Sequence, residues 1–293
     1  MSLPTERSTP RPLHQTDPQA LARVVFILVG TSHPGNVGSA ARAMKTMGLS
    51  ELRLVTPRYA DVCSQPEAIA FASGATDVLA GARHFDSLAD ALADISFAVA
   101  VSAEPREFGP PPAPPEVCAA KALATLAQSP EHRAAFVFGA ERTGLSIESV
   151  QICHLLASIP ASPVYSSLNL AQAIQILAYC LRREALAGAP QAFDQHAADQ
   201  HDRPLSASTA APDEIVSPMA SGAAIQGFFD HLERALLAIG YLDPLHPKKL
   251  MPRMRRLFLR TRLSAEEVDL LRGICKLMER GRASDGRPAR IEP

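Results

Sequence analysis

Short apolar runs alternate with amphipathic stretches between Val24 and Glu184, and this alternation restricts the possible folds more than any other feature of the chain. Each of five runs is long enough for one buried strand: VVFILV (24–29), LRLVT (52–56), FAVAVS (97–102), AAFVFG (134–139) and LLASIP (155–160). Apolar residues recur at helical spacing in residues 37–47 and 168–183. Strands alternating with helices predict an α/β fold, in which helices cover the faces of a mainly parallel sheet.

The first run leads into a polar, glycine-containing turn, GTSHPGNVGSAARAMKTMG (30–48). Its glycines fit neither the dinucleotide fingerprint G-x-G-x-x-G nor a P-loop, so we do not expect a nucleotide-phosphate loop. Small residues open the following helix, and Arg42 lies within its first two turns. Helix N-terminal amides beside a guanidinium suit an anionic group such as an RNA phosphate. An ordinary packed helix with a solvated arginine explains the same pattern equally well.

Two further motifs follow later strands of the predicted sheet. FVFGAERTGLS (136–146) places Gly139, Glu141, Arg142 and Gly144 at a strand end, where α/β folds usually bind ligands. IPASPVYSSLNLAQAIQ (159–175) places Ser166, Ser167 and Asn169 immediately before a helix. A turn with a surface ion pair, and a helix capped by Ser and Asn, account for the two motifs without any function.

The chain changes character after the predicted sheet. Residues 187–222 are rich in Ala, Gln, Asp, Ser and Pro, which predicts a flexible linker, and residues 1–20 have the polar composition of a disordered tail. A helical module is expected over 223–293, starting with an apolar helix that ends at Gly240. Its last helix is opened by the capping box Ser264…Glu267.

Charge and cysteine usage exclude several classes of protein. The net charge of −1 rules out a globally basic nucleic-acid binder, yet seven basic and no acidic residues lie between Pro247 and Arg262. Such a run is either a solvated face or a local surface for RNA. The five cysteines and nine histidines show no metal-ligand spacing, so we expect free buried thiols and no metal. Neither a signal peptide nor a membrane span is predicted, and a cytoplasmic location is expected.

Taken together and in this order, the motifs resemble the SPOUT superfamily of S-adenosylmethionine-dependent RNA methyltransferases, in its TrmH-like branch, and most closely the bacterial TrmJ family. The resemblance covers about residues 24–278, including TSHPGNVGSAARAMKTMGL, VFGAERTGL, YSSLNLA and the C-terminal HLE…IGYLDP…KLMPRMRRLF…LRGI. It implies a methyltransferase domain over 21–186 with a deep trefoil knot, and 2′-O-methylation of the ribose at tRNA nucleotide 32. The C-terminal module would be all-α and would dock RNA.

The resemblance also implies roles for individual residues. The cofactor would lie on strand ends and loops of the knot, against Val101, Ser102, Ala103, Gly139, Gly144, Ile159, Ser166, Ser167 and Leu168. Arg42, Glu141, Ser167 and Asn169 would form the catalytic site, with Glu141 and Asn169 bracing the loops. Arg42 would orient ribose and phosphate, and it is also the candidate to take the 2′-hydroxyl proton, although arginine is a poor general base.

For RNA, the resemblance implies contacts from both parts of the chain: Asn36, Arg42, Arg106, Arg142, Arg253, Arg255 and Arg256. Family members usually carry arginine where this chain has Glu104 and Ala140, which weakens the prediction of the substrate. A homodimer is implied, since in this superfamily the partner subunit completes each active site. The alternatives are a methyltransferase for another tRNA position or for ribosomal RNA, and a catalytically inactive RNA-binding protein of the same fold.

Overall fold

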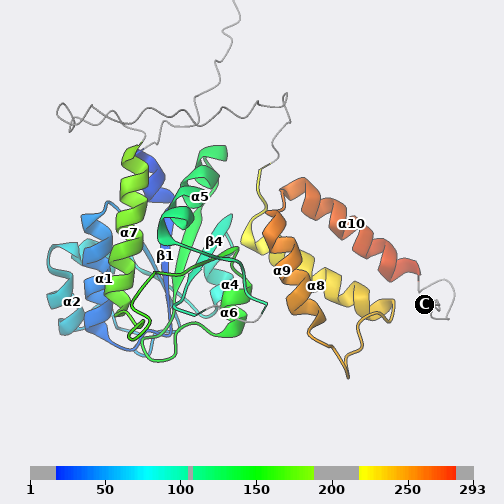
Figure 1. Cartoon of the computed structure of the whole chain (residues 1–293), viewed down its shortest axis with the longest axis horizontal. Coiled ribbons are helices and arrows are strands. Elements are labelled where there is room, and N and C mark those ends of the chain that lie inside the picture. Colours follow the sequence, from blue (N-terminus) through cyan, green and yellow to red (C-terminus); the bar gives the residue numbers. More distant parts are fainter. Residues whose placement is uncertain (1–17, 105–107, 188–217, 282–293) are drawn as a thin grey trace, which may run out of the picture.

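The structure is a computed structural model, and it describes residues 18–104, 108–187 and 218–281. Figure 1 shows an α/β domain on one side and three helices, coloured yellow to red, on the other. Most of the expected tail, most of the expected linker and the last twelve residues lie outside the described ranges, whereas residues 18–20, expected to belong to the tail, begin a 3-10 helix.

The α/β domain is built on a seven-stranded sheet with the strand order β3-β2-β1-β6-β4-β7-β5. Each strand pair found in the described residues is parallel, which confirms the expected mainly parallel sheet. The strands are β1 (Val24–Val29), β2 (Glu51–Val55), β3 (Arg83–Phe85), β4 (Phe97–Val101), β5 (Pro112–Ala113), β6 (Ala134–Phe138) and β7 (Leu155–Ala157).

Helices cover both faces of this sheet. The α-helices of the domain are α1 (Pro34–Thr46), α2 (Pro66–Ala72), α3 (Thr76–Ala80), α4 (Leu88–Ala91), α5 (Pro115–Gln128), α6 (Ile147–Gln151) and α7 (Leu170–Ala187), with short 3-10 helices at Pro18–Arg23 and Ser73–Ala75. In Figure 1, α1, α2 and α7 lie together, whereas α4 and α6 lie toward the C-terminal helices.

Side chains of β1 show why the central strands are apolar throughout. Val24, Phe26 and Leu28 belong to the core on the side of α1, α5 and α7, whereas Val25 and Ile27 belong to the core on the side of α4 and α6. All five side chains are fully buried. A parallel strand covered on both faces has no solvent side, and this accounts for runs such as VVFILV.

Several elements were not expected from the sequence. β3 and the helices α2 to α6 were missed, and the proline-rich stretch GPPPAPPE (109–116) contains strand β5 and the start of α5. Proline fits both places, since β5 is an edge strand and Pro115 is the first residue of its helix. The five cysteines are free thiols, four of them buried and Cys63 half-buried.

The C-terminal helices α8 (Gly222–Ala238), α9 (Leu250–Thr261) and α10 (Ala265–Gly281) enclose an apolar core of their own. Its centre is a group of aromatic rings: Phe258 meets Phe228 edge-on at 5.1 Å between ring centroids. The expected capping box is present, because Ser264 Oγ accepts from Glu267 N–H and the Glu267 carboxylate accepts from Ser264 N–H. Gly240 follows α8 with φ +76°, as expected for a residue that ends a helix.

Backbone hydrogen bonds attach this helical module to the α/β domain. The first two amides of α8 donate to the domain, Gly222 N–H to Ile95 O at 2.8 Å and Ala223 N–H to Ala93 O at 3.1 Å. Met219 N–H donates to Nε2 of His132 at 3.0 Å, and Arg262 bonds Thr125 Oγ1. The last residues of the expected linker therefore have defined partners, and α8 begins where its unpaired amides meet carbonyls of the domain.

Candidate functional site

A cavity of about 330 Å³ lies at the carboxyl ends of β4 and β6. Its walls come from residues 101–104, from the loop 138–144 and from the segment 159–173 that runs into α7. Ligands of parallel α/β sheets bind at this edge, because loops from neighbouring strands meet there. All nine residues expected at the cofactor line this one cavity: Val101, Ser102, Ala103, Gly139, Gly144, Ile159, Ser166, Ser167 and Leu168.

The loop after β6 folds tightly back on itself at the floor of this cavity. Gly144 N–H donates to Ala140 O at 2.8 Å, and Gly144 has φ +64°. A Cβ added to Gly139 would lie 2.1 Å from the carbonyl carbon of Gly144, so only glycine fits there. The spacing of the two glycines in FGAERTG thus follows from the crossing of their backbones.

Glu141 joins this loop to the turn that follows β1. Its carboxylate accepts from Thr31 Oγ1, from Ser32 N–H and Oγ, from His33 N–H and from Asn36 Nδ2, over distances of 3.0 to 3.3 Å. Burial alone would raise the pKa of Glu141, but the hydrogen bonds from Asn36 and Ser32 outweigh it and lower the pKa to about 2. Glu141 is therefore ionised and bonded at neutral pH, and it is unsuited to act as a general base.

Asn36 extends this network to the third motif. Its amide nitrogen donates to Glu141, and its amide oxygen accepts from Asn169 Nδ2 at 3.0 Å. Asn169 in turn accepts from Ala171 N–H at 2.9 Å with its own side-chain oxygen, and so caps α7. One chain of hydrogen bonds thus connects all three motifs. Asn36, expected at the RNA, uses both polar atoms of its side chain inside the protein.

Arg42 lies on the exposed side of α1, in a separate and open groove of about 460 Å³ between α1, α2 and α7. In the part of the chain that the structure describes, this groove and the cofactor cavity share no lining residue. They lie on two sides of the first turn of α7, where Leu170 and Ala173 face the cavity and Ala171 and Gln172 face the groove. The structure of a single chain does not bring Arg42 to the expected cofactor residues.

The small residues that open α1 have a purely internal explanation. A Cβ added to Gly38 would lie 2.1 Å from the carbonyl oxygen of Ala68 in α2, and Ala40 and Ala41 are fully buried. The close approach that these small residues allow is thus made by α2 of the same chain. Among residues 38–42, Arg42 is the only exposed one.

The basic residues of α9 differ in their surroundings. Arg253 is exposed and lies over the ring of Phe108 at 5.3 Å, as does Lys249, and Arg256, three residues further along the helix, is exposed as well. Arg255 instead lies over the ring of Phe229 at 4.5 Å. Burial lowers the pKa of Arg255. Helical spacing turns Arg255 toward the core of the C-terminal helices, whereas the expected contact with RNA would need an exposed side chain.

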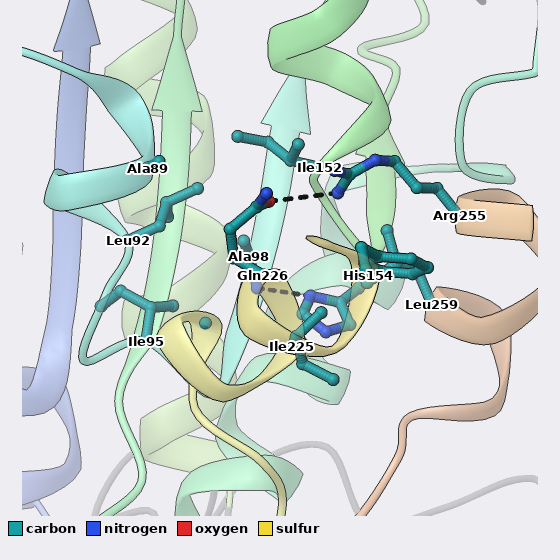
Figure 2. Close-up of a pocket in the computed structure, with 12 residues that line it drawn as sticks. Ala89, Leu92, Ile95, Ala98, Ile152, His154, Ile225, Gln226, Arg255 and Leu259 are labelled. Atoms are coloured by element: carbon teal, nitrogen blue, oxygen red, sulfur yellow. Dashed lines mark hydrogen bonds between the residues drawn. The ribbon is translucent and has the colours of Figure 1, made fainter. Parts of the chain in front are cut away.

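Arg255 also lines a small cavity of about 40 Å³ between α8, α9 and the domain, shown in Figure 2. There its guanidinium donates to Gln226 Oε1 at 3.1 Å. On the domain side, Nδ1 of His154 accepts from Ala98 N–H at 3.1 Å. Burial lowers the pKa of His154 to about 4, with a further contribution from the charge of Arg262. The cavity is too small for a cofactor, so we interpret it as a packing gap at the junction.

Two expected RNA contacts remain. Arg142 is exposed at the mouth of the cofactor cavity, together with Glu104. Arg106 lies outside the described residues. Sequence reasoning missed Thr31 and Ser32, which hold Glu141, and it missed the junction residue His132. Thr31 and Ser32 follow β1 in the same turn as Asn36, and this position after a strand was the signal in the sequence that could have identified them.

Among residues 18–104, 108–187 and 218–281, no group of three or more His, Cys, Asp or Glu is placed to hold a metal ion. Over the same ranges no helix has both the length and the apolar character needed to cross a membrane.

Comparison with known proteins gives matches along almost the whole chain. Residues 23–179 match the SpoU rRNA methylase family, and residues 223–288 match the C-terminal domain of the tRNA methyltransferase TrmJ. The tRNA (cytidine/uridine-2′-O-)-methyltransferase TrmJ of Klebsiella pneumoniae is 42% identical over 88% of this chain and 97% of its own. That of Escherichia coli K12 is 41% identical over 88% and 96%.

Solved structures agree. TrmJ from Zymomonas mobilis ZM4 superposes with a TM-score of 0.69 at 30% identity, covering 88% of this chain and all of its own. A probable methyltransferase from Bordetella pertussis Tohama I is 49% identical with a TM-score of 0.56, over 58% of this chain and all of its own. The chain therefore belongs to the SpoU methylase family, and within it to the TrmJ methyltransferases, which use S-adenosylmethionine.

Proposed function

We propose that the protein transfers a methyl group from S-adenosylmethionine to the ribose 2′-hydroxyl of tRNA, at nucleotide 32. The observation that carries the proposal is the convergence of three separated motifs on one cavity of about 330 Å³. The cavity is mostly backbone, small side chains and hydroxyls, which suits an uncharged adenosine and ribose. The names of the TrmJ relatives support the choice of tRNA.

The cofactor, when bound, supplies a methyl group on a sulfonium that already has a good leaving group. The task left to the protein is alignment of the ribose oxygen with that methyl group, which is proximity catalysis. The hydrogen-bonded network from Glu141 through Asn36 to Asn169 holds the loops that would perform it. Because Glu141 is saturated with donors, Ser167 or Arg42 is left to guide the 2′-hydroxyl proton.

A second copy of the chain completes the site in this proposal. Arg42 and the cofactor cavity lie on two sides of α7, so the arginine of one copy would serve the cavity of the other. Apolar side chains beside the groove support such a contact, since Phe71 and Tyr179 are about half exposed. A homodimer formed through α1 and α7 would cover both of these side chains.

The proposed fold of the cofactor segment is a deep trefoil knot. The tight crossing of Gly139 with Gly144 and the run from Ile159 into α7 would be its threaded loops. Proteins with such a thread are rare exceptions to the usual chain topology. A tRNA substrate would also place the enzyme in the cytoplasm, as expected from the sequence.

The direct test is methylation of unmodified tRNA transcripts by purified protein, with mass mapping of the product. Ribose methylation at nucleotide 32 supports the proposal, whereas methylation elsewhere or in ribosomal RNA would establish the first alternative. Leu168→Arg should abolish cofactor binding by filling the cavity, which calorimetry with S-adenosylmethionine measures. Wild-type protein that binds tRNA but no cofactor would establish the second alternative, an inactive RNA-binding protein.

A further inference from the structure

The last helix, α10, carries an apolar stripe on the side turned away from its own core. Leu270, Ile274 and Leu277 are 64%, 49% and 67% exposed, whereas Val268 and Cys275 of the same helix are buried. The stripe residues are four and three positions apart, so they form one line along the helix. Figure 1 shows α10 at the outer edge of the module, running away from the α/β domain. The proposed function does not use this surface.

A row of exposed charged residues runs beside the stripe. It has two acidic residues at one end, Glu266 and Asp269, and two basic residues at the other, Lys276 and Arg280, with Gly273 between them. The steps of three, four, three and four keep all five positions on one flank of the helix. The sign of the charge is therefore reversed about Gly273.

We propose that this face of α10 binds the same face of α10 in a second copy of the chain, with the two helices antiparallel. In an antiparallel pair related by a two-fold axis, the same flank of both helices comes together, and residues at equal distances from the axis meet. With the axis at Gly273, Glu266 faces Arg280 of the partner subunit, and Asp269 faces Lys276 of the partner subunit. The apolar stripes meet beside these pairs, Leu270 with Leu277 of the partner subunit.

The charge pattern selects this occupant over others. A second copy pairs every acidic residue of the row with a basic one, whereas a parallel arrangement sets like charges together. RNA would be repelled by the acidic end of the row. At the crossing point, a Cβ added to Gly273 has no heavy atom within 4 Å in this chain, so the surface is open for a close approach. Two helices bury less than a stable interface requires, so the contact adds to another between the same copies.

Cross-linking the full-length protein tests the register. Gly273→Cys puts a thiol at the axis, and a short bismaleimide should link two copies rapidly. Glu266→Cys is the matched control, because its thiols would lie about 20 Å apart at a rise of 1.5 Å per residue. Wild-type protein gives the background from the native cysteines. Equal yields from the two variants, or a yield at background for Gly273→Cys, would overturn the proposal.

Charge reversal tests the pairing. In the Gly273→Cys background, Glu266→Lys with Asp269→Lys should lower the cross-linking yield at least about tenfold, because the row becomes entirely basic. Adding Lys276→Glu and Arg280→Glu should restore it, since the pattern is again antisymmetric. A quadruple variant that stays at the level of the double variant contradicts the pairing. So does a cross-link that appears only after residues 282–293 are deleted, because that segment would then occupy the stripe.

This contact rests on the homodimer proposed around α1 and α7, which would hold the same two copies together, but it is tested separately from the cofactor site. Leu270→Lys should reduce the Gly273→Cys cross-link while leaving cofactor affinity unchanged, since α10 lines no part of the cofactor cavity among the described residues. A variant that keeps its cross-link despite Leu270→Lys would show that the stripe is not buried.

Discussion

The cofactor cavity and the basic helix α9 were both expected from short stretches of sequence, yet the structure treats them differently. In the cavity, residues from three motifs meet, and their polar groups bond one another through Glu141 and Asn169. On α9, neighbouring arginines separate: Arg255 packs on Phe229, whereas Arg256 is exposed. Motifs at the ends of neighbouring strands meet because the sheet places those ends at one edge. A run of like residues on a helix is instead divided among the faces of the helix.

The largest effect should come from Arg42→Ala, which tests whether methyl transfer needs the arginine of the groove in addition to the cofactor cavity. We expect methyl transfer to fall at least about a hundredfold, because the ribose is no longer held in line. Cofactor affinity should stay within about twofold in calorimetry, since Arg42 does not line the cavity. Arg83→Ala, an exposed arginine at the other edge of the sheet, is the control. Parallel loss of cofactor binding would place Arg42 at the cofactor instead.

Acid should weaken the junction before it affects the cavity. His154 has a pKa lowered to about 4 by burial, so the unfolded chain binds its proton first as the pH falls below about 6.5. We expect the free energy of unfolding to fall by about 2 kcal/mol between pH 7 and pH 5. Glu141 loses its contribution only below about pH 4.5, so it does not titrate in this window.

The measurement is urea denaturation at several pH values. His154→Asn keeps a side-chain acceptor for Ala98 N–H without a titrating ring, and it should flatten the slope. An unchanged slope in that variant would assign the effect to another group.

Glu141→Gln should weaken the cavity by a smaller amount. An amide nitrogen in the place of Oε2 would face the N–H and hydroxyl donors of Ser32, at a cost of about 1–3 kcal/mol. Cofactor affinity should fall about tenfold, because the loop 138–144 is no longer fixed. Glu148→Gln on α6, an exposed position, is the matched control for charge removal. Wild-type affinity and stability in Glu141→Gln would show that its bonds are dispensable.

The smallest effect distinguishes the arginines of α9 from one another. If this helix binds tRNA, Arg256→Gln should lower the slope of log affinity against log salt by about 0.7–0.9, the amount for one phosphate contact. Arg255→Gln should leave the slope unchanged and lower stability instead, since its guanidinium packs on Phe229. Equal slope changes in both variants would mean that burial does not decide which arginine meets RNA.

The sequence predicted the central strands and the cavity residues well, but it did not predict the edge strands or the hydrogen bonds that hold the site. Long apolar runs such as 24–29 and 134–139 became central strands, because burial on both faces leaves a plain signal. β3 and β5 were missed because strands of two or three residues at sheet edges bury little. The nine cavity residues were predicted through family motifs, whereas the five donors around Glu141 depend on how two distant loops meet.

The junction could not be predicted from the sequence for a different reason. Its main partners are backbone groups, such as the carbonyl oxygens of Ala93 and Ile95, and every residue has these. His132 and Arg262 contribute side chains, but nothing in their local sequence marks them as partners of residues about 90 and 140 positions away.

The first and last connections of the helical module run side by side. Ala220 N–H donates to Leu263 O, and Ala265 N–H donates to Pro218 O, so the chain enters the module against the turn between α9 and α10. These two hydrogen bonds join the entry segment of the module to the turn between its last two helices. A foreign host protein that carried the module would have to supply the groups that meet it here: two free carbonyls, a nitrogen acceptor in the place of His132, a hydroxyl in the place of Thr125, and an aromatic ring in the place of Phe97, over which Arg262 lies.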